Sequence, residues 1–320
     1  MMRIAILGIG SIGGVLLGAL ADTDAEMVAV ARGTTASELL EIGLVMHTPE
    51  GSIEVVPPED FASFDSAAGP VPESIHGTCA AAILCGKADS TSMLVQLAED
   101  VLSPEGVAIS VQNGLGHAEA LAHRLGRSRV LGASITHAAW RDGEGSVHWA
   151  GRGAIRLGWL DGGAPSGAAT ELLATLEAAG LEPVWSEDMQ RVVWIKLLVN
   201  VAINPVCSIA GVRNGALLEV PDLWEQALAA MQEAAGGDFV QPYNDPRVIA
   251  GELHVEQRRQ WIHDRHQVSW RELRFDELHQ RRQHPHGVDV GHVVFVEKEH
   301  EDTRVEPGGL ALLVIRVADA

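Results

Sequence analysis

The sequence predicts an α/β fold in two parts: a sheet of buried strands alternating with helices, and then a mainly α-helical part. A strand at Arg3–Leu7 leads directly through a glycine-rich turn into an apolar helical segment. Short apolar segments typical of buried strands recur up to about residue 185, and one long helical pattern follows from Glu187. We therefore divide the chain near residue 185 into domains of residues 1–185 and 186–320.

Composition narrows the class of protein. The chain has 320 residues, enough for two ordinary domains, and its net charge of −20 argues against nucleic acid or an anionic membrane as a partner. Three cysteines are too few for a disulfide framework and lack metal-ligand spacing. We find no run of about 20 apolar residues and no secretory signal pattern. A cytoplasmic protein without a metal site is expected.

The turn after the first strand is Gly8-Ile9-Gly10-Ser11-Ile12-Gly13, a G-x-G-x-x-G sequence. Gly8 permits a tight turn, Gly10 lets a pyrophosphate approach the backbone, and Gly13 lets the helix pack closely on the strand. The unpaired N–H groups and the dipole of the first helical turn stabilise a diphosphate. Because a strand precedes this motif and a helix (Val15–Ala21) follows it, we expect a dinucleotide site rather than a structural turn.

The end of the second strand, Met27–Ala31, indicates which dinucleotide binds. An NAD site usually has Asp or Glu at this strand end for the ribose 2′-hydroxyl, whereas an arginine accommodates a 2′-phosphate. Residues 29–33 contain no acid, and Arg32 stands in its place. NADP(H) is therefore the expected cofactor; the alternative is that Arg32 is an ordinary exposed arginine.

Two polar residues follow later strands of the predicted sheet. We expect a helix at Ser37–Ile42, strands around Val45 and at Ile53–Val56, Cys79–Cys85 and Val107–Val111, and a loop at Ala62–Pro72. Lys87 and Asn113 each come just after one of these strands. Ligands of open α/β sheets bind beyond the carboxyl ends of the strands, so both side chains are expected in one crevice. A solvated loop lysine is the alternative for Lys87.

Further strands and one helix complete the first domain. We expect strands at Val130–Ala133, Ser146–Trp149 and Ala154–Gly158, a helix at Gly167–Ala179 and an edge strand at Val184–Trp185. Pro165 at the start of this helix and Gly180 just past its end are typical of helix termini.

The long helix predicted at Glu187–Ala210 carries a second informative pattern. Lys196, Asn200 and Asn204 are spaced i, i+4 and i+8, so they share one face of the helix. Their neighbours are apolar, and polar groups on a buried helix are costly unless they are paired. The pattern indicates a wet cleft, where desolvation makes a lysine ammonium a good proton donor. The alternative is that all three side chains bond to neighbouring helices.

Several groups of residues, in order along the chain, resemble the ketopantoate reductase (2-dehydropantoate 2-reductase) family. They are Gly8-Ile9-Gly10-Ser11-Ile12-Gly13, Ala31-Arg32-Gly33, Lys87, Gln112-Asn113-Gly114, Thr136-His137-Ala138-Ala139, Lys196-x-x-x-Asn200-x-x-x-Asn204-Pro205 and Asn214-Gly215. The resemblance covers residues 1 to about 235. It implies a Rossmann-type NADP-binding domain, a helical substrate domain and an active site between them.

The resemblance also implies an activity and residue roles. NADPH would reduce ketopantoate, a small keto acid, to pantoate for pantothenate and coenzyme A synthesis, and homodimers are common among such reductases. By position, Lys196 is the general acid, and the substrate-binding residues are Asn113, Asn200, Asn204 and Asn214. The cofactor-binding residues are Gly8, Gly10, Ser11, Ile12, Gly13, Arg32, Lys87, Asn113 and Ala138.

After about Ala235 the sequence departs from the family. The resemblance implies a Ser-Ser-Met-like and a Glu-Ile-Asp-like segment there, which supply a substrate-binding serine and acid, and we find neither. No motif assigns a role to Ser269, Glu272 or Glu277. The segment is rich in His, Arg, Gln and Glu, and we expect its His-Pro-His at residues 284–286 to be solvated rather than a metal site.

Alternatives stay open for the tail and for the function. The coding sequence either shifted frame near residues 236–250 or encodes a divergent domain, which translating the other frames of the DNA would test. The alternatives to ketopantoate reduction are a related NAD(P)-dependent hydroxyacid or opine-type dehydrogenase, and a cofactor-binding protein inactivated by its altered C-terminus.

Overall fold

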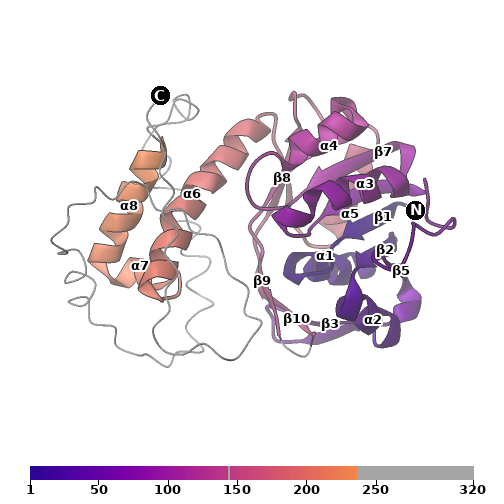
Figure 1. The fold of residues 1–320 in the computed structure, drawn as a ribbon, viewed down its shortest axis with the longest axis horizontal. Coiled ribbons are helices and arrows are strands. Elements are labelled where there is room, and N and C mark those ends of the chain that lie inside the picture. Colours follow the sequence, from indigo (N-terminus) through magenta and orange to yellow (C-terminus); the bar gives the residue numbers. More distant parts are fainter. Residues whose placement is uncertain (143–144, 236–320) are drawn as a thin grey trace.

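A large, mostly parallel sheet forms the centre of the N-terminal part (Figure 1). The computed structural model describes residues 1–142 and 145–235. The sheet has eight strands, in the spatial order β12 (Pro183–Trp185), β11 (Ile155–Trp159), β8 (Val130–Ile135), β7 (Leu102–Ser110), β6 (Cys79–Leu84), β1 (Arg3–Leu7), β2 (Glu26–Ala31) and β5 (Phe61–Asp65). The strands from β8 to β5 run parallel, and β11 and β12 run antiparallel to them. The predicted α/β class is confirmed.

Helices cover both faces of this sheet. The helices are α1 (Ser11–Ala21), α2 (Gly33–Glu41), α3 (Thr91–Val101), α4 (His117–Leu125) and α5 (Ala168–Ala178). α1 and α5 pack in one apolar cluster with Ile4 and Ile6 of β1, whereas α3 and α4 pack in another with Ala5 and Leu7. Because consecutive residues of β1 are buried on opposite faces, the strand has to be apolar throughout.

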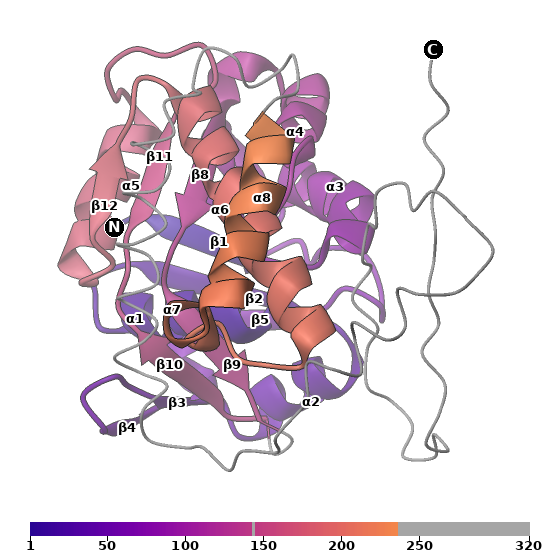
Figure 2. The ribbon, with the colours of Figure 1, turned by 90° about the vertical axis from the view of Figure 1, so that its left-hand side faces the viewer.

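A second, four-stranded sheet packs against α1. Its order is β4 (Ile53–Val56), β3 (Leu44–His47), β10 (Val147–Gly151) and β9 (Ala138–Arg141), and Figure 2 shows it at the lower edge of the molecule. A Cβ on Gly14 would lie 2.5 Å from Cγ2 of Val147, and one on Gly18 would lie 2.6 Å from Cε of Met46. The two glycines therefore let α1 pack closely on the small sheet.

Some predictions of local structure need correction. The loop predicted at Ala62–Pro72 is wrong at its start, because β5 pairs there with β2 as the last strand of the sheet. The alanine and serine of β5 are typical of a loop and led to the wrong prediction, although Phe61 and Phe64 are buried as in a strand. Pro165 lies before α5 rather than in its first turn. α3, α4 and β9 are not among the predicted elements.

Three helices follow the large sheet: α6 (Met189–Ala210), α7 (Ala216–Glu219) and α8 (Pro221–Ala235). α6 packs on β8 at one end and beside α8 further along, with Leu198 and Ala202 in a common cluster with Leu223 and Ala227 (Figures 1 and 2). Of the described helices, α6 is the one with the length and apolar composition of a membrane span. Its packing on a sheet and on α8 leads us to interpret it as a core helix.

Candidate active site

The glycine-rich turn between β1 and α1 combines closely packed and open positions. Gly8 has a φ of +101°, and a Cβ on it would lie 2.8 Å from the amide nitrogen of Gly86, so this position requires glycine. A Cβ on Gly13 would lie 2.0 Å from the carbonyl oxygen of Gly8. The absence of a side chain at Gly13 therefore lets the start of α1 pack against the turn. No described atom lies within 4 Å of a Cβ on Gly10, and no described side chain caps α1, whose first residues are Ser11 and Ile12. An approaching diphosphate would find backbone N–H groups there.

Charged side chains lie beyond the ends of β2 and β6. Arg32 and Lys87 are both exposed, and Nη2 of Arg32 donates a hydrogen bond to Oγ of Ser90 at 3.3 Å. An acid that the sequence did not reveal lies beside Arg32: Asp65, at the end of β5, accepts a hydrogen bond from the N–H of Gly33 at 3.3 Å. A positive and a negative group thus flank the end of β2.

Gln112 joins the loops that follow β6 and β7. Its Nε2 donates to the carbonyl oxygens of Gly86 at 2.8 Å and Lys87 at 3.1 Å, and to Oγ1 of Thr91 at 3.1 Å. His117 adds a second link, because its ring nitrogens lie 3.0 Å from Oγ1 of Thr91 and 3.0 Å from the carbonyl oxygen of Asn113. These bonds set the position of Asn113 relative to the glycine-rich turn.

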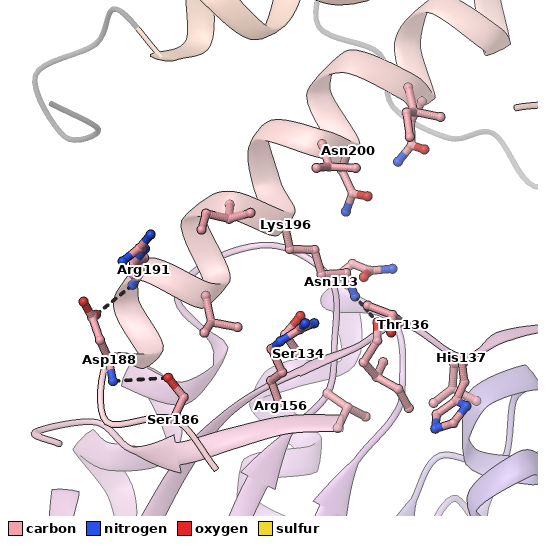
Figure 3. A pocket seen from close by; sticks show the side chains of 18 of the residues that line it. Asn113, Ser134, Thr136, His137, Arg156, Ser186, Asp188, Arg191, Lys196 and Asn200 are labelled. Atoms are coloured by element: carbon pink, nitrogen blue, oxygen red, sulfur yellow. Dashed lines mark hydrogen bonds between the residues drawn. The ribbon is translucent and has the colours of Figure 1, made fainter. Parts of the chain in front are cut away.

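A cavity of about 720 Å³ lies between the large sheet and α6 (Figure 3). It brings together the predicted residues Ile12, Asn113, Lys196, Asn200, Asn204 and Asn214. The other predicted cofactor residues are not among those that line it: Gly8, Gly10, Ser11, Gly13, Arg32 and Lys87 lie in or beside the loops after β1, β2 and β6, and Ala138 begins β9.

Lys196 lies on the face of α6 that is turned toward the sheet. Its side chain is half-buried, and Nζ donates a hydrogen bond of 2.5 Å to the carbonyl oxygen of Ile135, the last residue of β8. Figure 3 shows Lys196 extending from the helix toward this strand, with Asn200 further along the same face. The predicted shared face is therefore present, and it faces a cavity.

Sequence reasoning missed two polar residues in the sheet wall of the cavity. Ser134 of β8 is 5% exposed, and Arg156 of β11 is half-buried. The two are directly paired across the antiparallel strands. The sequence did contain a signal for both residues, because each is the one hydroxyl or charged side chain in an otherwise apolar strand. Burying such a group is costly unless it forms hydrogen bonds.

His137 also lines the cavity, at its buried side. Its Nδ1 accepts a hydrogen bond from the N–H of Gly153 at 2.9 Å, and its Nε2 lies 3.1 Å from the carbonyl oxygen of Leu181. This pattern requires the neutral ring with the proton on Nε2. Burial holds the pKa of His137 below its ordinary value of 6.5.

The start of α6 carries charges of both signs at the cavity. Oδ1 of Asp188 caps the helix by accepting a hydrogen bond from the backbone N–H of Arg191 at 2.9 Å. Glu187 and the side chain of Arg191 line the same end of the cavity. Sequence reasoning assigned none of these residues.

The described residues contain three free thiols and no cluster of metal-ligating side chains. Cys79, Cys85 and Cys207 are free, and burial raises the pKa of Cys207 to about 11. No three His, Cys, Asp or Glu side chains gather as metal ligands within residues 1–142 and 145–235. The structure does not describe Ser269, Glu272, Glu277, His284 or His286.

Family models match both parts of the chain. The model described as ketopantoate reductase PanE/ApbA matches residues 4–162, and the one described as ketopantoate reductase PanE/ApbA C terminal matches residues 188–236. The chain is 30% identical over 221 residues to 2-dehydropantoate 2-reductase of Halobacterium salinarum, which covers 69% of each chain. It is 31% identical over 232 residues to the enzyme of that name from Pyrococcus horikoshii, covering 72% of each.

Solved structures share the fold. A PanE/ApbA family ketopantoate reductase from Ralstonia eutropha JMP134 has a TM-score of 0.66 at 22% identity, covering 81% of this chain and 82% of its own. A ternary structure of D-mandelate dehydrogenase with NADH and anilino(oxo)acetate has a TM-score of 0.69 at 21% identity, covering 80% of each.

Proposed function

The chain belongs to the ketopantoate reductase family, and we propose that it catalyses the NADPH-dependent reduction of 2-dehydropantoate (ketopantoate) to pantoate, for pantothenate and coenzyme A synthesis. The observation that carries this proposal is the position of Lys196, held by Ile135 at the wall of a cavity that also contains Asn113, Asn200 and Asn204. Reduction of a ketone needs a proton donor at its oxygen and groups that orient the substrate.

Lys196 is the general acid in this proposal. When bound, NADPH supplies a hydride to the ketone carbon of the substrate. Nζ of Lys196 donates a proton to the alkoxide oxygen that develops there, so that the ketone becomes a secondary alcohol. The hydrogen bond to Ile135 orients Nζ, and the positive charge stabilises the forming oxyanion.

Four asparagines bind the substrate in this proposal. Asn200 and Asn204 line the cavity from the same face of α6 as Lys196, and Asn113 and Asn214 line it from loops. A carboxamide both donates and accepts hydrogen bonds, so these groups suit the hydroxyl and carbonyl oxygens of ketopantoate.

Residues 1–185 hold the cofactor in this proposal, and the helices that follow hold the substrate. The open backbone at Gly10, followed by Ser11 and Ile12 at the start of α1, fits a diphosphate. Arg32, exposed at the end of β2, favours a 2′-phosphate and hence NADPH, and Lys87 adds positive charge nearby. Asn113 and Ala138 complete the proposed set of cofactor-binding residues.

NADPH oxidation by the purified full chain with ketopantoate tests this proposal. Lys196→Ala should lower kcat by roughly 10²-fold or more, because general acid catalysis typically contributes that much. Lys196→Arg keeps the charge but has a pKa too high to release a proton readily, so it should also be slow. Both variants should still bind NADPH.

Two results would contradict the proposal. If Lys196→Arg turns over at the wild-type rate, Lys196 contributes charge and not a proton. If the wild type oxidises NADPH with other 2-oxo acids but not with ketopantoate, the chain is instead a related hydroxyacid dehydrogenase. NADPH binding without turnover of any keto acid would favour a cofactor-binding protein.

A further inference from the structure

The sheet wall of the cavity carries a pair of polar side chains that the mechanism above does not use. Arg156 of β11 and Ser134 of β8 are direct partners in the antiparallel register, so their side chains stand side by side on one face. The next pair on that face is Gly158 and Gly132, and a Cβ on either would lie within 3.2 Å of Met189 of α6. This face therefore meets α6, and Arg156 and Ser134 border the cavity between them (Figure 3).

Both side chains lack a partner within the part of the chain that the structure describes. The hydroxyl of Ser134 is 5% exposed and has no hydrogen bond to another described side chain or backbone group. The half-buried guanidinium of Arg156 likewise has no hydrogen bond or ion pair among residues 1–142 and 145–235. Buried polar groups are nearly always paired, so the unpaired hydroxyl of Ser134, beside a guanidinium that faces the same cavity, points to a ligand.

A carboxylate is the ligand that fits this pair. A guanidinium presents two parallel N–H groups that match the two oxygens of a carboxylate, and a serine hydroxyl can donate to one of these oxygens. The acids of the same cavity, Glu187 and Asp188, lie at the start of α6, where Asp188 is occupied as the helix cap and Arg191 offsets the negative charge.

Lys196 and the Arg156–Ser134 pair line the same cavity at the end of β8. Lys196 is bound to the carbonyl oxygen of Ile135, the residue that follows Ser134. Ser134 and Ile135 are consecutive residues at the end of β8, so the proton donor and the Arg156–Ser134 pair border the same part of the cavity. In a 2-oxo acid the ketone and the carboxylate are on adjacent carbon atoms, so one molecule can reach both.

We propose that Arg156 and Ser134 bind the carboxylate of a 2-oxo acid and so make the site selective for charged substrates over neutral ketones. This inference rests on the proposed function in that it places the ketone of the same molecule at Lys196. It assigns carboxylate binding to residues of β8 and β11, so that this task needs no residue after residue 235.

The first test compares a keto acid with a neutral ketone. Ketopantoyl lactone has the ketone of ketopantoate but no free carboxylate. Arg156→Met should lower kcat/KM for ketopantoate by about 10- to 100-fold, chiefly through KM, and change that for the lactone less than about threefold. Arg156→Lys should lie between Arg156→Met and wild type, and Ser134→Ala should give a smaller loss confined to the acid. Equal losses on both substrates would overturn the inference.

The second test does not depend on turnover. Oxamate carries a carboxylate next to a carbonyl group, and its binding to the full chain with NADP⁺ can be measured by calorimetry. Arg156→Met should weaken oxamate binding at least tenfold, whereas Arg124→Met, which removes an exposed arginine paired with Glu99, should leave it unchanged. Unchanged oxamate binding in Arg156→Met would overturn the inference.

The two tests separate this inference from the proposed function. If the wild type does not reduce ketopantoate but binds oxamate in an Arg156-dependent way, the carboxylate site stands and the proposed activity fails. If the wild type reduces ketopantoate and Arg156→Met matches it in both tests, the activity stands and the carboxylate site fails.

Discussion

Single residues at the end of β2 carry the proposed recognition of the dinucleotide. The guanidinium of Arg32 attracts a 2′-phosphate, whereas the carboxylate of Asp65, bonded to the N–H of Gly33, repels one and can accept a hydrogen bond from a ribose hydroxyl. Arg32 is an exposed group near the loop at Ser90. In the proposed cofactor site, the choice between NADPH and NADH would depend on the balance between these two neighbouring side chains.

Arg32→Ala should shift this balance toward NADH. We expect the ratio of kcat/KM for NADPH to that for NADH to fall about tenfold or more, because a charge-assisted contact to phosphate is lost. Asp65→Asn is the matched variant, since it keeps an acceptor for Gly33 while removing the negative charge, and it should move the ratio in the opposite direction. Equal losses with both cofactors in Arg32→Ala would contradict this role.

At the scale of elements, Arg141 of β9 joins the small sheet to the glycine-rich turn and to α2. Its Nη1 donates to the carbonyl oxygen of Ile9 at 3.1 Å and to Oγ1 of Thr35 at 2.8 Å, and its Nη2 donates to Oε2 of Glu38 at 2.6 Å. The side chain is 20% exposed, so these bonds are largely shielded from water. One arginine thus sets the position of three elements around the predicted cofactor site.

Arg141→Met should loosen this junction. We expect the free energy of unfolding to fall by about 2 kcal/mol, because Ile9 and Glu38 lose a charged partner, and NADPH binding to weaken with it. Arg124→Met breaks an exposed ion pair with Glu99 and should cost about 0.5 kcal/mol or less. Urea unfolding and NADPH titration of both variants check this, and equal stability of the two would contradict it.

At the scale of the whole molecule, stability depends on pH through both net charge and buried groups. The chain carries a net charge of −20 near pH 7, so mild acid relieves repulsion between carboxylates. His137 acts in the opposite direction, because burial lowers its pKa in the folded state and the unfolded chain binds the proton more readily. Its contribution is complete above the unfolded value of 6.5 and is lost as pH falls from there toward the folded pKa.

His137→Asn should make unfolding less sensitive to mild acid. At pH 5.5 the wild type loses at most about 1.4 kcal/mol through His137, since that pH is about one unit below the unfolded pKa. Asn can still accept from Gly153 but does not titrate, so its stability should fall less between pH 7.5 and 5.5. His123→Asn, at an exposed position on α4, is the control. Parallel pH curves for wild type and His137→Asn would rule this linkage out.

Much of the fold and one wall of the candidate site were predictable because they depend on short-range patterns. β1 has the predicted bounds, and α6 begins only two residues after the predicted Glu187. Lys196, Asn200 and Asn204 follow the helical period, which sets their shared face whatever the helix packs against. β5 escaped prediction because its alanine and serine have low strand propensity, and its pairing with β2 supplies the missing stabilisation.

The sequence by itself therefore determined the class of fold, the glycine-rich turn and the polar face of α6, since each depends on residues close together in the chain. Only the tertiary structure decided what stands opposite that face. Arg156 and Ser134 meet through the register of β11 on β8, and Asp65 reaches Gly33 through the pairing of β5 with β2. Strand register joins residues distant in sequence, and no local pattern specifies which side chains it brings together.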